Sequence, residues 1–97
     1  MQVYSERKLR DFWKNRPDAE GPLEAWYREV RNADWKKPSD IKAMYGSASI
    51  LKGGRVVFNI GGNKYRLVVQ INYAYQVVYI LFIGTHKQYD TIDAEEV

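Results

Sequence analysis

The chain has 97 residues, of which 45% are hydrophobic and 28% charged, and this size and composition fit one folded domain, residues 1–97. It has no cysteine and a single histidine, His86, so disulfides, thiolate zinc sites, iron–sulfur clusters and multi-histidine metal centres are excluded. The net charge is +3, yet four of the 12 acidic residues follow position 89, so residues 1–89 form a basic body and the C-terminal end from about residue 90 is acidic.

A basic body favours a polyanionic partner such as nucleic acid, because lysine and arginine neutralise phosphates. A surface that is charged only for solubility is the alternative. The first 16 residues carry many charges and no apolar leader segment. The longest apolar run, Val77–Ile83, has about seven residues, whereas a membrane-spanning helix needs about 20. We therefore expect a cytoplasmic protein with no membrane partner.

The first half of the chain has apolar residues at helical spacing. Ser5 is the expected N-cap of a first helix, and Pro17 ends it. The apolar face of this helix is formed by Leu9, Phe12 and Trp13. A second helix begins near Asp18, and Ser39 is the expected cap of a short third one. The apolar stripe of the second helix is formed by Leu23, Trp26, Tyr27 and Val30.

In the second half of the chain the apolar residues alternate, which is typical of strands. Three strands are predicted, at residues 55–60, 65–73 and 76–83, and Gly61–Lys64 is the hairpin turn between the first two. Met1–Tyr4 is a candidate for an additional strand. The predicted fold class is α+β, with two N-terminal helices packed on one face of a small antiparallel sheet.

The other face of this sheet is expected to be open and to carry the polar side chains of the strands. The helices should cover the face with Phe58 and Leu67, because those positions are apolar. Alternation then turns to the open face the side chains of Arg55, Asn59, Arg66 and Gln70. A turn at Gly62-Asn63 sets Asn59 directly opposite Arg66.

Several enzyme motifs are absent. The turn Gly61–Lys64 lacks the spacing of a phosphate-binding P-loop, no G-x-S-x-G motif accompanies the lone histidine, and no carboxylate pair occupies a strand face. What remains is a group of cationic and polar residues: Lys42, Lys64, Arg66, His86, Lys87 and Tyr89. Arginine and lysine can neutralise a pentacoordinate phosphorane while another group moves protons, so these residue types suit RNA cleavage without a metal.

Each member of this group also has an ordinary structural explanation, such as an arginine paired with a carboxylate or a tyrosine that plugs the core. Their occurrence together just past a glycine favours a site. Strict alternation from Ile83 turns the His86 side chain away from Arg66, so we expect a bend at Gly84 that brings the two together.

Three stretches resemble the HigB family of bacterial toxins. These are Lys36-Lys37-Pro38, then Val57 to Asn63 with Tyr65 to Val68, and finally Thr85 to Asp90. The signatures V-F-N-x-G-G-N and T-H-K-x-Y-D are specific as a pair, although each is weak alone. This resemblance implies a RelE-like fold and a ribosome-dependent mRNA interferase that enters the ribosomal A site and cuts mRNA. It also implies a cognate HigA-type antitoxin with a helix-turn-helix domain.

The resemblance carries over to individual positions. Arg66 matches the strand arginine of the family that lies next to the scissile phosphate. The C-terminal motif is matched by His86, Lys87 and Tyr89, and the turn motif by Asn59, Asn63 and Lys64. The wider fold family often has two lysines on the strand before the hairpin, where this chain has Phe58, Asn59 and Ile60. A lysine base on that strand is therefore not expected.

Our leading interpretation is an endoribonuclease in which the substrate 2′-hydroxyl attacks the adjacent phosphate, with no metal and no cofactor. Arg66 and Lys87 would stabilise the phosphorane, His86 would transfer a proton, and Tyr89 would stack on a base or transfer a second proton. The candidate RNA-binding residues are Lys42, Arg55, Asn59, Asn63 and Lys64. The alternatives are a non-catalytic RNA- or ribosome-binding domain that blocks translation, and a domain that docks on an acidic protein.

Overall fold

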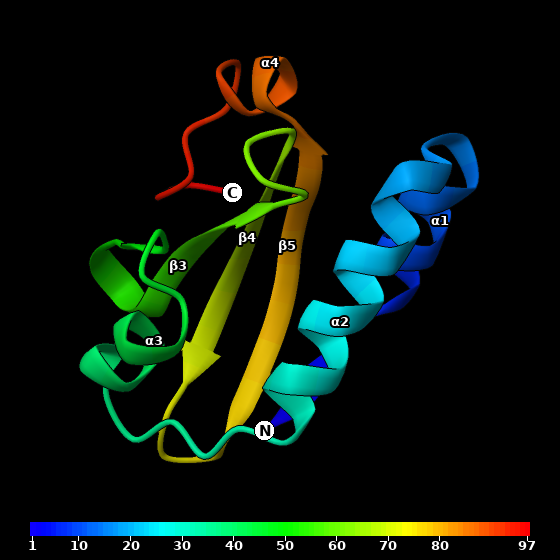
Figure 1. Cartoon of the computed structure of the whole chain (residues 1–97). Coiled ribbons are helices and arrows are strands. Elements are labelled where there is room, and N and C mark those ends of the chain that lie inside the picture. The colour runs from blue at the N-terminus through cyan, green and yellow to red at the C-terminus, as the bar shows by residue number, and fades with distance from the viewer.

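The computed structural model describes the whole chain, residues 1–97, as four helices and five strands (Figure 1). The helices are α1 (Arg7–Asn15), α2 (Glu20–Arg31), α3 (Pro38–Met44) and α4 (His86–Tyr89). The strands are β1 (Gln2–Tyr4), β2 (Ser49–Ile50), β3 (Arg55–Ile60), β4 (Tyr65–Asn72) and β5 (Val77–Thr85). Short 3₁₀ turns occupy Pro17–Ala19 and Lys52–Gly54. None of the helices combines the length and the apolar character that crossing a membrane requires.

The five strands form one sheet in the order β1-β5-β4-β3-β2. The predicted α+β class is confirmed, but the prediction of a purely antiparallel sheet is wrong, because β1 pairs with β5 in parallel. The backbone nitrogen of Met1 donates to the carbonyls of Arg31 and Ala33, at 3.0 and 2.9 Å, beside the C-terminal end of α2. A positive group is favoured there by the helix dipole, and this anchor sets where β1 enters the sheet.

The β3–β4 hairpin has the predicted register, with Asn59 opposite Arg66. The expected bend at Gly84 is wrong. Gly84 stays in the ladder opposite Arg66, and β5 continues to Thr85. The irregularity lies earlier, because Val68 pairs with Phe82 while Val69 pairs with Ile80, which leaves one residue of β5 bulged out.

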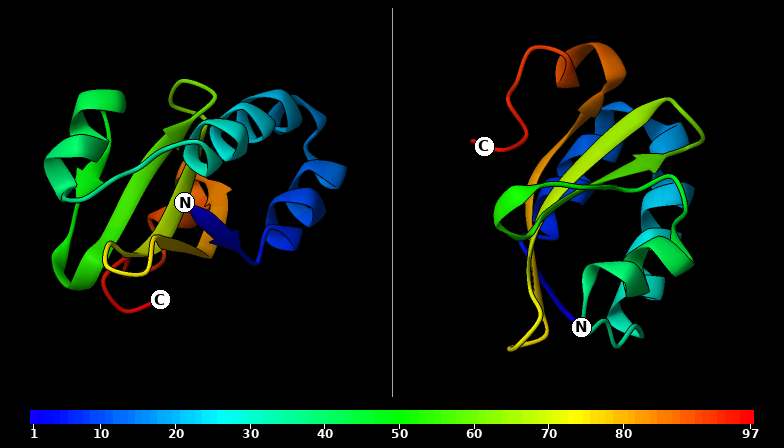
Figure 2. Two further views of the ribbon diagram at one scale, coloured as in Figure 1. Left: turned by 90° about the horizontal axis from the view of Figure 1, so that it is seen from below. Right: turned by 90° about the vertical axis from the view of Figure 1, so that its left-hand side faces the viewer.

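The main core lies between the helices and one face of the sheet (Figure 2). Leu9 of α1, three residues of the predicted α2 stripe and the face with Phe58 and Leu67 are all buried in it. The stripe residues in question are Leu23, Trp26 and Val30. The prediction of two covering helices was incomplete, since Ile41 of α3 is buried in the same core.

Two predicted helix caps are wrong. Ser5 has a φ of 69°, and α1 begins only at Arg7 after Glu6, because the chain turns sharply between β1 and the helix. Ser39 lies inside α3, whose first residue is Pro38, a position where the missing N–H of proline costs nothing.

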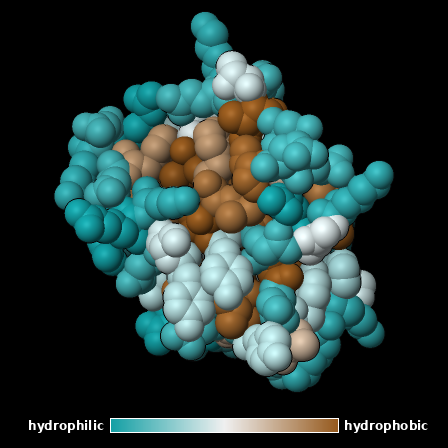
Figure 3. Space-filling view, turned by 180° about the vertical axis from the view of Figure 1, so that it is seen from behind, coloured by the Kyte–Doolittle hydropathy of each residue, from teal (hydrophilic) through white to brown (hydrophobic).

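The second face of the sheet is only partly open, contrary to expectation. The chain after α4 folds back over it, and Ala94 is buried against Val57 and Val68. Tyr89 and Ile92 also pack there. Figure 3 shows this side of the molecule as an apolar area surrounded by hydrophilic side chains. The reason is sequence spacing: Val57 and Val68 alternate onto this face and need cover, which the apolar residues of the tail supply.

Candidate active site

One end of the sheet is formed by the β3–β4 turn, and the glycines of this turn are required by its backbone. Gly61 and Gly62 have φ values of +64° and +71°, which side chains rarely tolerate. The next residue, Asn63, accepts from the Arg66 guanidinium through both its backbone carbonyl and its Oδ1, each at 3.3 Å. Arg66 also donates to the Tyr65 carbonyl at 3.3 Å. Arg66 as a residue is half-buried, and these bonds hold its guanidinium against the turn.

Lys64 in the same turn is tied to the connection between α1 and α2. Its Nζ lies 2.9 Å from Asp18 Oδ2, and the Tyr65 hydroxyl donates to Asp18 Oδ1 at 2.6 Å. The hydrogen bond from Tyr65, followed by that from Lys64, lowers the pKa of Asp18. The same contacts with Asp18 raise the pKa of Lys64 and that of Tyr65. This ion pair leaves Lys64 charged but already paired in the free protein.

Helix α4 starts beside this turn because of a capping box. The Thr85 hydroxyl accepts from the Gln88 N–H at 3.1 Å, and the Gln88 side chain accepts from the Thr85 N–H at 2.8 Å. The His86 N–H donates to the Lys64 carbonyl at 3.1 Å, which joins the start of α4 to the turn. Through this bond the structure places the His86 backbone at the same end of the sheet as Arg66 (Figure 1).

The side chains of α4 differ in exposure. His86 and Lys87 are exposed, and His86 Nε2 lies 3.7 Å from Asp90 Oδ1. Tyr89 is half-buried and packs in the small cluster under the C-terminal tail. The fold thus brings the segments that carry Arg66, Lys64, His86 and Lys87 to the same end of the sheet, with a carboxylate beside His86. Such a set can bind a phosphate and move protons around it.

Position 84 has no room for a side chain. A Cβ there would lie 2.6 Å from Phe82 Cζ and 2.8 Å from Gln88 Oε1. Glycine therefore lets the capping residue Gln88 approach β5 directly opposite Arg66.

Two of the candidate RNA-binding residues, Lys42 and Arg55, are engaged in other contacts, and a third, Asn59, lies opposite Arg66 but its side chain forms no hydrogen bond with it. Lys42 Nζ donates to the carbonyls of Gly46 and Ala48, at 2.6 and 2.8 Å. Arg55 begins β3, about 13 Å along the strand from Asn59. Its guanidinium donates to Gln70 Oε1 and to the Val97 carbonyl. The amide of Asn59 reaches only the Ser47 carbonyl, at 3.4 Å.

Sequence reasoning missed the residues that hold this group in place. Asp18, Thr85, Gln88 and Asp90 all contact a candidate residue or cap its helix. The capping box had a readable signal, the spacing T-x-x-Q directly after an apolar strand. Asp18 had none, because it meets Lys64 only through the tertiary fold.

Comparison with known proteins identifies the family. The model of the HigB_toxin family, described as the RelE-like toxic component of a toxin-antitoxin system, matches residues 19–92. The mRNA interferase toxin HigB of Escherichia coli (strain K12) is 31% identical over 96 residues, which cover 97% of this chain and 92% of that protein. The mRNA interferase HigB of Escherichia coli O6:H1 is 21% identical over 94 residues, 95% of this chain and 91% of the relative. The chain therefore belongs to the HigB family of RelE-like toxins.

Proposed function

We propose that this chain is an mRNA interferase, the endoribonuclease toxin of a toxin-antitoxin system. The observation that carries the proposal is the end of the sheet where Asn63 holds Arg66 and where α4 begins beside Lys64. Membership of the HigB family and the activity named for its relatives support it. The exposed His86 and Lys87 are available there to a substrate.

The proposed reaction uses the RNA's own nucleophile. The 2′-oxygen bonds to the adjacent phosphorus, the bond from phosphorus to the 5′-oxygen breaks, and the products are a 2′,3′-cyclic phosphate and a 5′-hydroxyl. One proton leaves the 2′-hydroxyl and one reaches the departing 5′-oxygen. Charge accumulates on the phosphorane oxygens between these events, so fixed cations beside them lower the barrier.

Roles follow from position and chemistry. Arg66 is fixed by backbone and amide oxygens, so it can meet a phosphorane with little reorganisation. Lys87 supplies a second cation, and His86 is the proton-transfer group. Tyr89 packs in the cluster under the tail, which favours a role as a platform for a base.

The substrate and partners follow from the same proposal. The substrate is mRNA in the ribosomal A site, and the ribosome supplies the alignment that a small enzyme cannot supply alone. A HigA-type antitoxin with a helix-turn-helix domain restrains the toxin. The setting is the cytoplasm, where ribosomes and mRNA meet, and the set of acting groups uses no cofactor.

Induced expression tests the proposal. The wild type should arrest growth and create new mRNA 5′ ends, whereas Arg66→Ala and His86→Ala should each lower cleavage about 100-fold or more. Equal growth arrest by all three proteins would refute the assigned roles. Growth arrest with intact transcripts would instead indicate a non-catalytic domain that blocks translation.

A further inference from the structure

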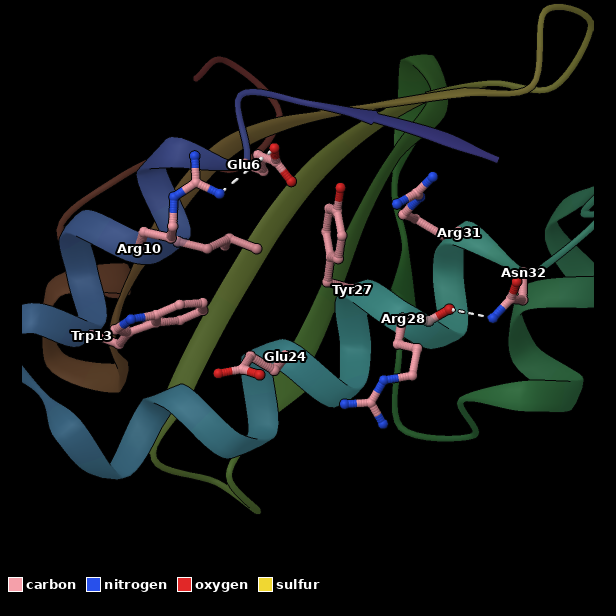
Figure 4. A pocket seen from close by; sticks show the side chains of 9 residues that line it. Glu6, Arg10, Trp13, Glu24, Tyr27, Arg28, Arg31 and Asn32 are labelled. Atoms are coloured by element: carbon pink, nitrogen blue, oxygen red, sulfur yellow. Dashed lines mark hydrogen bonds and ion pairs between the residues drawn. The ribbon is translucent and has the colours of Figure 1, made fainter.

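A groove separates α1 from α2 on the helical side of the molecule (Figure 4). Its volume is about 600 Å³, and its apolar surface is formed by Leu9, Trp13 and Tyr27. Trp13 and Tyr27 are both half-exposed, so their rings remain accessible. None of the residues assigned to the active site lines this groove. Unfilled aromatic surface of this kind on a helix pair is a typical docking feature.

Side chains of both charge signs line the groove: Glu6, Arg10, Glu24, Arg28 and Arg31. Glu6 at its edge pairs with Arg10 at 3.6 Å, and the neighbouring Tyr27 hydroxyl lowers the pKa of Glu6. Farther along α2, the Arg31 guanidinium lies 5.7 Å from the centre of the Tyr27 ring. Arg28, one turn earlier, is exposed and forms no ion pair. The C-terminal end of α2 therefore offers two guanidinium groups, one exposed at Arg28 and one beside the Tyr27 ring at Arg31.

The groove also carries acidic side chains. Glu24 of α2 lines it, one turn before Arg28, and Glu20 lies one turn before Glu24 on the same helix. The neighbouring Glu24 carboxyl group raises the pKa of Glu20. A nucleic-acid strand would bring its phosphates against these carboxylates. A protein segment can instead carry both acidic and basic side chains, so the groove is better suited to a protein ligand than to RNA.

We propose that the α1–α2 groove is the docking surface for the antitoxin. This inference rests on the proposed function, since it takes the partner from the toxin-antitoxin family. The antitoxin segment presents an apolar side chain to Trp13 and Tyr27, a carboxylate to Arg28 and a basic group to Glu24. The chemistry of the groove thereby defines an amphipathic segment that carries both acidic and basic side chains.

Charge reversal tests the docking surface. The full chain is expressed with the Arg66→Ala change, which permits its production, and is titrated with the purified protein encoded by the adjacent reading frame. Arg28→Glu with Arg31→Glu should raise the Kd at least tenfold. Arg7→Glu with Lys8→Glu is the matched control, because both residues are exposed on α1 outside the groove, and it should leave the Kd unchanged. Thermal unfolding checks that each variant is folded, and Arg28→Gln replaces the double change if that variant does not fold.

Growth assays with Arg66 intact give the second readout. The double variant should still arrest growth when expressed alone, but the antitoxin should no longer restore growth. An unchanged Kd for the double variant would overturn the inference. So would loss of mRNA cleavage with antitoxin binding intact, which would make the groove an RNA surface. If the wild type cleaves no mRNA but still binds through Arg28, the docking surface stands and the proposed function fails.

Discussion

At the scale of single residues, the main feature of the site is that Arg66 is oriented before any substrate binds. Its three acceptors are the Tyr65 carbonyl and two oxygens of Asn63. A long arginine side chain loses much rotamer entropy when it is fixed, and here the fold, not the substrate, bears that loss. In the proposed reaction, Asn63 is therefore a positioning residue that acts through Arg66.

Replacing Asn63 with alanine tests this role. Asn63→Ala removes the Oδ1 acceptor but keeps the backbone carbonyl, so we expect mRNA cleavage to fall about tenfold, less than for Arg66→Ala. The thermal midpoint should change little, because Asn63 is exposed. Single-turnover cleavage on programmed ribosomes measures the effect. Asn15→Ala, at the exposed end of α1, is the control, and equal losses in both variants would contradict the positioning role.

At the scale of elements, α4 depends on its cap. A helix of four residues has almost no intrinsic stability, because the entropy cost of nucleating it exceeds the gain from the hydrogen bonds of a single turn. The reciprocal bonds of Thr85 and Gln88 offset that cost and set the direction in which His86 and Lys87 leave the strand. The sequence singled out these two residues as candidates, but it placed the change of direction at Gly84 and not at the cap.

Removing the cap should separate catalysis from folding. Thr85→Ala is expected to cost about 1 kcal/mol, confined to α4, and to lower mRNA cleavage several-fold while the main core stays intact. Hydrogen exchange of the α4 amides together with cleavage rates measures both effects. Thr85→Ser retains the hydroxyl and should restore activity; cleavage as low in the serine variant as in the alanine variant would disprove the capping role.

The ion pair of Asp18 and Lys64 links two elements, and its contribution to stability depends on pH. Folding lowers the pKa of Asp18 below its ordinary value of 3.8, so this group stabilises the fold above that value. The stability is lost as pH falls through the lowered pKa. The pKa values of Lys64 and Tyr65 are raised, so their contributions are lost only as pH rises through those values.

Asp18→Asn should therefore reduce the free energy of unfolding at about pH 7 and matter much less at about pH 3. Urea unfolding at both pH values measures the difference. Glu20→Gln is the control, because the neighbouring Glu24 raises the pKa of Glu20 and its ionised form gains no stability from folding. An Asp18→Asn deficit that stays constant between the two pH values would show that the ion pair contributes nothing.

At the scale of the whole molecule, the features that depend on local sequence patterns were predicted, whereas those that depend on tertiary contacts were not. The helical stripe of Leu23 and Trp26 and the register of Asn59 against Arg66 were readable, because both follow from periodicity and turn length. The parallel pairing of β1 and the cover of Val57 by the C-terminal tail were not. Both join segments that are far apart in the sequence, and no local pattern records such partners. The same applies to Arg55, which bonds to the Val97 carbonyl and so lies away from the Arg66 site.

The fold also places the acidic C-terminal tail near Arg66, and the tail should therefore affect the affinity for RNA. The tail packs on the sheet face that carries Val68, two positions along β4 from Arg66, so its carboxylates oppose the positive potential of the site.

Replacing Asp93 with asparagine and both Glu95 and Glu96 with glutamine should tighten the binding of single-stranded RNA several-fold at low salt. The gain should vanish at high salt, where screening removes it. Fluorescence anisotropy across a salt series measures this. The same charge change on the helical side, Glu20→Gln with Glu24→Gln and Asp34→Asn, is the control, and an equal gain there would mean that only net charge matters.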